Sequence, residues 1–371
     1  MAPESYLADR FGYFLGICCA LAIACVGCGS PPDLPAHTGG VVDAPASSIE
    51  HHEEFFEGAR GAKLYAQWWR PRNGAVRGAL VIVHGLRDYS ARYAEIGERL
   101  AKDGIAVYAA DLRGHAHSSG RRVSIATFDD YTDDLDLLVR RTQQREPHVP
   151  VYLFGFSMGG AIAADYAITY HPDIHGLILA GAALDVDVSG LKIASTKAVA
   201  SINPDAGLFT LDPHDFSRDP QVVDLNLHDP LVYQDGAPVH TAVELLAAID
   251  TIKKRMHEIA VPLLVMHGKA DKVTPPAGSV ALYAAAASTD KTLTLYDGLY
   301  HDLLHEPEKL RVEGDIEKWL LAHLDKTAAP RGASTAAASA AASAPPAATT
   351  TTAGSSNTPI GPASMGAAKT N

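Results

Sequence analysis

The chain has 371 residues, of which 47% are hydrophobic and 20% charged, and its formal net charge is −12. These proportions are typical of a globular protein with a substantial core, and without a basic stripe we expect no nucleic-acid partner. All four cysteines (Cys18, Cys19, Cys25 and Cys28) lie in the first 28 residues. The rest of the chain has no cysteine, and therefore no disulfide framework, cysteine metal site or catalytic thiol.

Residues 1–28 are typical of an export signal. Their apolar stretch is shorter than the ~20 residues that a membrane-spanning helix needs, and small residues lead up to Cys28. The segment resembles a bacterial lipoprotein signal, so we predict a lipid anchor on Cys28, with Cys25 as second choice, and attachment to a membrane of a bacterial cell. A cleaved signal giving a periplasmic or secreted protein, or an uncleaved anchor, stays open, because Glu4 and Asp9 replace the expected positive charges.

Composition divides the remainder into three parts. Residues 29–51 are rich in Pro, Gly and Ala, which predicts an extended, flexible tether. Residues 52–326 carry the pattern of a folded domain. Residues 327–371 consist mainly of Ala, Ser, Thr, Pro and Gly, cannot build a core, and are predicted to be disordered.

Strands alternate with helices along the domain, which predicts an α/β fold with a mostly parallel central sheet and helices on both faces. A hairpin is expected first, from Phe55-Phe56 and Leu64–Trp69, and the continuous apolar run Ala79–Val83 then indicates a strand buried on both faces. Further strands are predicted at 105–110, 151–154, 176–180, 262–266 and 292–296. Helices are predicted at 91–102, 128–141, 279–287 and 309–324, besides one that follows residue 160.

The alternation lapses between about 184 and 250, where prolines are scattered among short apolar pieces. An insertion of this length between two sheet strands is expected to lie over the carboxyl ends of the strands as a lid. The alternative is that this insertion is a surface segment without a function.

The segment Val149–Gly160 carries the main functional motif. It contains an apolar strand, the sequence Gly155-Phe156-Ser157-Met158-Gly159, and then a good helix opening. A strand, a Gly-x-Ser-x-Gly turn and a helix are the context of a nucleophile elbow, in which the serine is held strained with its hydroxyl exposed. We therefore predict Ser157 as the nucleophile.

A serine nucleophile needs a base, usually histidine, and a carboxylate that orients it. Asp271 follows the predicted strand 262–266, and His301 lies in the loop after 292–296. This is the order Ser, acid, His, with each residue at the carboxyl end of a strand. For the oxyanion we predict the backbone N–H groups of Met158 and Leu86, and we interpret His84 as a loop-shaping residue.

These pieces together resemble the monoacylglycerol lipase-like serine hydrolases of the α/β-hydrolase fold, in the serine-aminopeptidase-like and lysophospholipase branch. The resemblance implies Ser157 as nucleophile, Asp271 as acid and His301 as base, with no cofactor and no metal. It implies hydrolysis of carboxylic esters, monoacylglycerols or lysophospholipid-like single-chain lipids, through an acyl-enzyme. The motifs that carry it are His84-Gly85-Leu86, Asp111–His115, Gly155–Gly160, Ser217–Pro220, Asp229–Val232, His267–Asp271 and Tyr300–Leu304.

Three other functions are weighed against this one. An amide-cleaving, aminopeptidase-like hydrolase would keep the same three residues, and a non-catalytic lipid-binding protein would use only the fold. The segment His301-Asp302-Leu303-Leu304-His305 is similar to the His-Glu-x-x-His motif of zinc proteases, but aspartate replaces the glutamate and no convincing third ligand follows.

Overall fold

The computed structural model describes residues 48–185, 199–204, 206–209 and 211–328. The predicted signal with Cys28 and Cys25, and nearly all of the predicted tether and tail, lie outside the described residues. Two predicted limits need correction. The first strand already begins at Ile49, so residues 49–51 belong to the sheet, and the last helix continues to Ala328.

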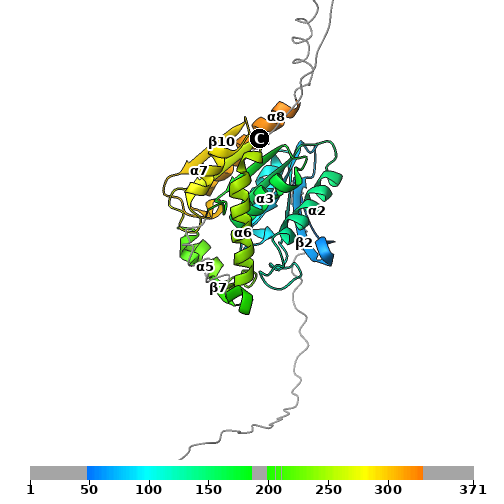
Figure 1. Ribbon diagram of the computed structural model, residues 1–371. Coiled ribbons are helices and arrows are strands. Elements are labelled where there is room, and N and C mark those ends of the chain that lie inside the picture. Colours follow the sequence, from blue (N-terminus) through cyan, green and yellow to red (C-terminus); the bar gives the residue numbers. More distant parts are fainter. Residues whose placement is uncertain (1–47, 186–198, 205, 210, 329–371) are drawn as a thin grey trace, which may run out of the picture. The chain divides into compact units, whose positions relative to one another are not determined.

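An eight-stranded sheet forms the middle layer of the folded part (Figure 1). Its strand order is β1-β2-β4-β3-β5-β6-β9-β10, and it is parallel except where β2 pairs with β1 and with β4. This confirms the predicted mostly parallel sheet and its initial hairpin. The strands are β1 (Ile49–Glu57), β2 (Lys63–Pro71), β3 (Gly78–Val83), β4 (Ile105–Ala110), β5 (Val151–Phe156), β6 (Gly176–Ala180), β9 (Leu263–Gly268) and β10 (Lys291–Tyr296).

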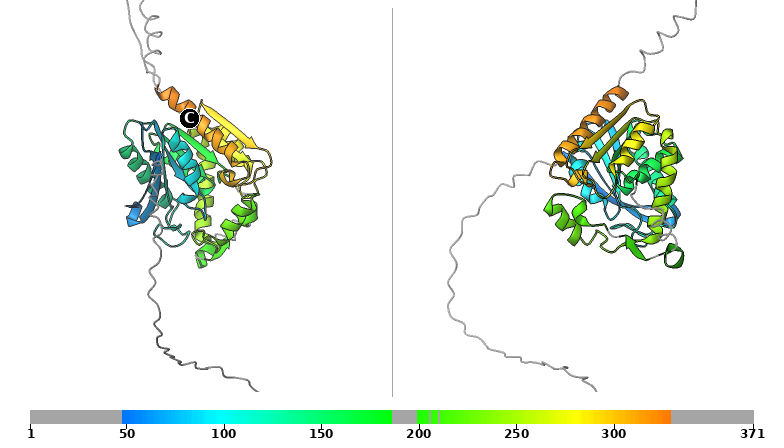
Figure 2. Two further views of the ribbon diagram at one scale, coloured as in Figure 1. Left: turned by 180° about the vertical axis from the view of Figure 1, so that it is seen from behind. Right: turned by 60° about the vertical axis from the view of Figure 1, so that its left-hand side comes forward.

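Helices cover both faces of this sheet (Figures 1 and 2). On one face, α1 and α8 pack their apolar side chains against the strands, and on the other face α2, α3, α6 and α7 do so. Because both faces are covered, the central strands are apolar along their whole length, as Ala79–Val83 predicts. The helices are α1 (Ala94–Lys102), α2 (Asp129–Arg145), α3 (Met158–Tyr170), α6 (Val239–Arg255), α7 (Pro276–Ala285) and α8 (Lys309–Ala328).

One predicted helix starts differently in the structure. The helix predicted from residue 91 begins as a 3₁₀ turn, η2 (Ser90–Tyr93), which then continues into α1. Among the described helices, none combines the length and the apolar character that crossing a membrane requires.

The predicted insertion, residues 184–250, follows β6. Its described part holds η3 (Pro213–Asp215), α5 (Pro220–His228) and the strands β7 (Gly207–Phe209) and β8 (Ala237–Pro238), which pair antiparallel. Asp219 caps α5 by accepting from Gln221 N, and Pro220 occupies the first turn, where its missing N–H costs nothing. Helix α6 continues past residue 250 to Arg255, so the predicted end of the insertion falls inside a helix.

Candidate active site

Ser157 lies in the sharp turn between β5 and α3, with φ 54° and ψ −120°. A non-glycine residue in such a conformation costs ~1–3 kcal/mol, so the surrounding chain must hold it there. The two glycines of the motif make this possible. A Cβ on Gly159 would lie 2.2 Å from Val83 O, and one on Gly155 would lie 2.5 Å from Gly159 O. The turn therefore requires Gly-x-Ser-x-Gly for reasons of space.

The structure brings the three predicted side chains into one hydrogen-bonded series. Ser157 Oγ lies 2.8 Å from His301 Nε2, and His301 Nδ1 lies 2.8 Å from Asp271 Oδ2. The side chains of His301 and Asp271 are fully buried, and Ser157 is 8% exposed. They meet because β5, β9 and β10 are parallel, so the segments after these strands share one edge of the sheet.

The Asp271 carboxylate is held from several sides. Its Oδ1 accepts from the backbone N–H groups of Val273 and Thr274, at 2.7 and 2.9 Å. Its Oδ2 lies 3.0 Å from Nε2 of a second buried histidine, His267. Burial raises the pKa of the Asp271 carboxyl, but the charges and hydrogen bonds of His301 and His267 outweigh burial and hold this pKa well below its ordinary value. Asp271 is therefore ionised at neutral pH and fixes the tautomer of His301.

His267 is a residue whose contact with the site the sequence analysis missed, although it belongs to the quoted motif His267–Asp271. Its Nδ1 lies 2.7 Å from Ser279 Oγ on α7, and its Nε2 lies 3.0 Å from Thr274 O. The available signal was a histidine at the end of a fully buried strand, where a polar side chain needs partners.

Two aromatic rings enclose the imidazole of His301. The ring centroid of Phe156 lies 5.0 Å from that of His301, and the ring of Phe216 meets it edge-on at 5.3 Å. Phe216 belongs to the insertion, and its carbonyl oxygen accepts from Asp302 N at 2.7 Å. The insertion thus supplies part of the environment of His301.

The loop after β3 lies beside the nucleophile, where the sequence predicts Leu86. A Cβ on Gly85 would lie 3.1 Å from Ser157 Cβ. His84 stabilises this loop, because its Nδ1–H donates to Gly85 O at 2.8 Å and its Nε2 accepts from Leu112 N at 2.9 Å. This geometry agrees with the loop-shaping role expected of His84. Met158 begins α3, so its N–H has no partner within the helix.

The zinc-protease alternative does not fit the observed geometry. The ring nitrogens of His301 face Ser157 and Asp271, whereas His305 Nδ1 lies 2.8 Å from Asp302 Oδ1 and His305 Nε2 lies 3.1 Å from Arg92 O. The two histidines therefore face different partners. Residues 301–305 also form only a 3₁₀ turn, η5 (Leu303–His305), and not the α-helix that the motif needs.

A narrow cavity of about 20 Å³ lies next to the site. Its walls include Leu86, Arg87 and Phe156 from the domain, and Phe216 and Val232 from the insertion. This volume holds about one water molecule. A larger cavity of about 770 Å³ is lined by Pro150, at the other end of β5, and by none of Ser157, Asp271 and His301.

Comparisons with known proteins agree with this arrangement. Residues 74–308 match the family described as serine aminopeptidase, S33. The chain is 33% identical over 279 residues to a monoacylglycerol lipase of Mycolicibacterium smegmatis, covering 75% of this chain and 99% of that protein. It is 32% identical to a monoglyceride lipase of Rattus norvegicus, covering 71% and 88%. A crystal structure of a Paleococcus ferrophilus monoacylglycerol lipase aligns with a TM-score of 0.62 at 28% identity, covering 74% and 99%.

Proposed function

This chain belongs to the serine aminopeptidase S33 family of α/β-hydrolases and is a carboxylic ester hydrolase, and we propose that it cleaves monoacylglycerols or lysophospholipid-like single-chain esters through an acyl-enzyme on Ser157. The observation that carries the proposal is the hydrogen-bonded series of Ser157, His301 and Asp271 at one edge of the sheet. The proposal is also supported by sequence similarity to a monoacylglycerol lipase over 99% of that protein's length.

Each residue has a distinct role in the proposed reaction. His301 Nε2 takes the hydroxyl proton as Ser157 Oγ attacks the ester carbon, and the same nitrogen then gives this proton to the leaving alcohol. Asp271 keeps the Nδ1–H of His301 in place and stabilises the imidazolium that forms. Water, activated by His301 in the same way, releases the fatty acid and restores Ser157.

The developing oxyanion needs donors that are in place before the reaction. We assign the backbone N–H groups of Met158 and Leu86 to this role. Met158 supplies the N–H at the first residue of α3, where the helix dipole also favours negative charge. Leu86 comes from the loop that passes next to Ser157 Cβ.

The insertion is proposed to act as a lid over an acyl-chain site. Phe216 and Val232 of the insertion and Leu86 and Phe156 of the domain give the small cavity beside the site its apolar walls. An acyl chain needs far more room than about 20 Å³, so we propose that these walls separate when the substrate enters.

We propose that residues 1–28 act as an export signal and place this activity at a membrane of a bacterial cell. A lipid on Cys28, or alternatively on Cys25, and the tether that follows would hold the domain near lipid substrates. Radiolabelled palmitate incorporated into the wild-type chain and lost in Cys28→Ala, with Cys25→Ala as the matched variant, tests this assignment.

The function is tested by hydrolysis of monoacylglycerols of increasing acyl length, p-nitrophenyl esters and aminoacyl amides by the full-length chain. Ser157→Ala serves as the inactive variant, and Ser119→Ala, an exposed serine on the loop after β4, as the matched control. We expect wild type and Ser119→Ala to prefer medium or long acyl chains, and Ser157→Ala to lose about 10⁴-fold or more in rate. Cleavage of amides alone favours the aminopeptidase-like function, and a folded wild type that cleaves nothing favours a lipid-binding protein.

A further inference from the structure

Arg87 directly follows Leu86 in the loop after β3 and has an unusual backbone conformation. Its φ is 60°, in the left-handed region that side chains other than those of Gly, Asn and Asp rarely adopt. Such strain persists only where the surrounding structure holds the residue in place. Leu86 and Arg87 share a planar peptide that contains the Leu86 carbonyl, so whatever holds Arg87 also restrains the Leu86 backbone from its carbonyl side, one φ and ψ pair away from the Leu86 N–H.

The side chain of Arg87 crosses from this loop to the insertion. Its Nε–H donates to Tyr233 O, its Nη1 donates to Leu211 O at 3.3 Å, and its Nη2 donates to Gln234 Oε1 at 3.3 Å. All three acceptors belong to the insertion, and Arg87 is only 9% exposed. The planar guanidinium thus joins two separate stretches of the insertion to one residue of the loop.

One of the three acceptors, Gln234, is itself held by hydrogen bonds within the insertion. Gln234 Nε2 donates to Asn226 O, just before the end of α5, at 2.9 Å and to Val232 O at 3.2 Å. Arg87 and Val232 also line the small cavity beside the site. The three hydrogen bonds of Arg87 therefore depend on the position of the insertion and not on a single flexible side chain.

We propose that Arg87 is a positioning residue that couples the insertion to the oxyanion site. With the insertion in place, its hydrogen bonds keep Arg87 in the left-handed conformation, and the neighbouring N–H of Leu86 stays directed at the substrate oxygen. When the insertion moves away, the hydrogen bonds are lost and the Leu86 donor is no longer fixed. The inference rests on the proposed function, because it takes Leu86 N–H as an oxyanion donor.

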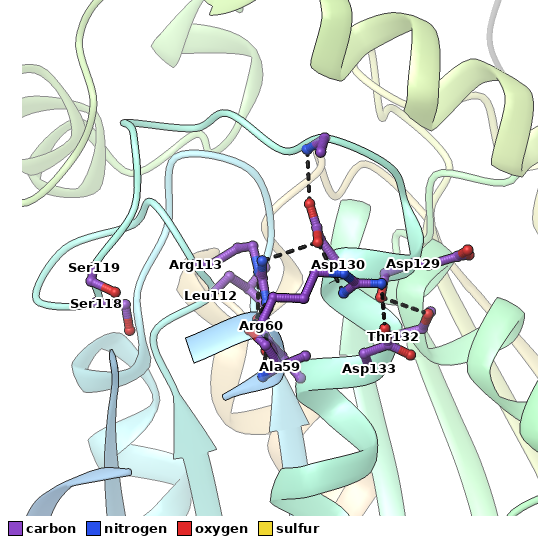
Figure 3. Close-up of polar contacts among 12 residues, drawn as sticks. Ala59, Arg60, Leu112, Arg113, Ser118, Ser119, Asp129, Asp130, Thr132 and Asp133 are labelled. Atoms are coloured by element: carbon purple, nitrogen blue, oxygen red, sulfur yellow. Dashed lines mark hydrogen bonds and ion pairs between the residues drawn. The ribbon is translucent and has the colours of Figure 1, made fainter. Parts of the chain in front are cut away.

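Arg60 offers a matched control (Figure 3). The backbone of Arg60 is also in the left-handed region, with φ 55°. Its guanidinium forms ion pairs with Asp130 at 3.0 Å and with Asp133 at 2.7 Å, both on α2. Arg60→Gly therefore relieves the same backbone strain and removes ion pairs of a half-exposed side chain, outside the loop and the insertion.

The test compares steady-state kinetics of Arg87→Gly, Arg87→Lys and Arg60→Gly on a short, soluble p-nitrophenyl ester, with the thermal midpoint of each. Glycine fits φ 60° without strain, so Arg87→Gly is expected to fold. We expect its kcat to fall about tenfold or more, since losing an oxyanion donor costs 10²–10³-fold, with KM within about twofold. Arg87→Lys should recover part of kcat, and Arg60→Gly should keep it.

A second variant approaches the same contact from the insertion. Gln234→Ala removes one acceptor and should lower kcat less than Arg87→Gly does. The double variant should be no worse than Arg87→Gly alone, because both changes break one interaction. Additive losses, or a change in KM alone, would overturn the coupling.

The failure of this inference is distinguishable from failure of the proposed function. Wild-type kcat in Arg87→Gly and Arg87→Lys, with Ser157→Ala inactive, overturns the role of Arg87 and leaves the function standing. Full activity of Ser157→Ala overturns both.

Discussion

His267 Nε2 lies 3.0 Å from Asp271 Oδ2, the same oxygen that lies 2.8 Å from His301 Nδ1. Asp271 is thus shared by two buried imidazoles, and only one of them reaches the nucleophile. The same Nε2 of His267 lies 3.0 Å from Thr274 O, so its N–H is shared between that carbonyl and the carboxylate. His267 thus helps to fix the carboxylate on which the orientation of His301 depends, with at most the ~1.5–3 kcal/mol of a full hydrogen bond to a charged group.

His267→Leu is expected to lower kcat about tenfold or more, because one donor to the carboxylate is lost and Asp271 is freer to turn. His267→Gln, which keeps an N–H donor, should recover part of the rate. The measurement is kcat on a short soluble ester together with the thermal midpoint. A lowered midpoint with unchanged kcat in His267→Leu would mean that His267 serves folding alone.

Phe216→Ala removes the ring that meets the His301 imidazole edge-on at 5.3 Å. An aromatic pair of this kind contributes ~0.5–1.5 kcal/mol beyond burial, so we expect kcat to fall several-fold even on a short ester that needs no acyl site. Phe55→Ala, which removes an exposed ring on β1, is the control and should leave kcat unchanged. A loss confined to long-chain substrates would assign Phe216 to substrate binding instead.

Gly159→Ala tests the spatial requirement of the elbow. The added Cβ would lie 2.2 Å from Val83 O and 2.4 Å from His84 O, which are backbone atoms that cannot move aside cheaply. We expect a loss of ~1–3 kcal/mol in the free energy of unfolding, measured by urea denaturation, together with loss of activity. Gly314→Ala in α8, where the nearest atom lies 3.8 Å away, should instead stabilise by up to ~1 kcal/mol. Equal stability changes in both variants would contradict this account.

The buried ion pair beside the site predicts how stability depends on pH. Arg92 lies 3.0 Å from Asp302, and His305 lies 2.8 Å from the same carboxylate. Burial raises the pKa of Asp302, but the charges of His305 and Arg92 and the hydrogen bond from His305 lower it further than burial raises it. Because its pKa is lower in the folded than in the unfolded protein, Asp302 stabilises the fold above pH ~4.

That stabilisation is lost as the pH falls from about 4 through the lowered pKa of Asp302. Asp302→Asn should lower the free energy of unfolding at pH 7, by less than the ~3–5 kcal/mol of an unpaired buried charge, because Arg92 keeps Asp88 at 3.5 Å. The free energy of unfolding of this variant should fall less steeply than that of the wild type below pH 4. Urea denaturation between pH 7 and pH 3 measures both effects. If the free energy of unfolding falls equally steeply with pH in the variant and the wild type, Asp302 does not contribute to the loss of stability in acid.

The features of the fold and of the active site that the sequence predicts are those that depend on short stretches of the chain. Glycines around Ser157 specify the elbow by spacing, and the positions of Asp271 and His301 after apolar strands place them at one edge of a parallel sheet. The contacts of Phe216 with His301 and of Arg87 with Tyr233 join segments that are distant in the chain. No periodicity or spacing encodes such contacts, because they depend on how the insertion packs. The start of β1 and the end of α8 also lie a few residues beyond the predicted limits. For β1 the reason is pairing with β2, which begins at Ile49↔Pro71 and which the sequence of one strand does not reveal.

The most direct test of the central claim is the mass of the peptide that carries Ser157 after reaction with a p-nitrophenyl alkylphosphonate. Such a reagent forms a stable ester with a serine that His301 activates. We predict one equivalent of phosphonate on Ser157, bound in proportion to the loss of esterase activity, and no incorporation in Ser157→Ala. Full inactivation with Ser157 unmodified, or esterase activity that persists after complete modification of Ser157, would contradict the account.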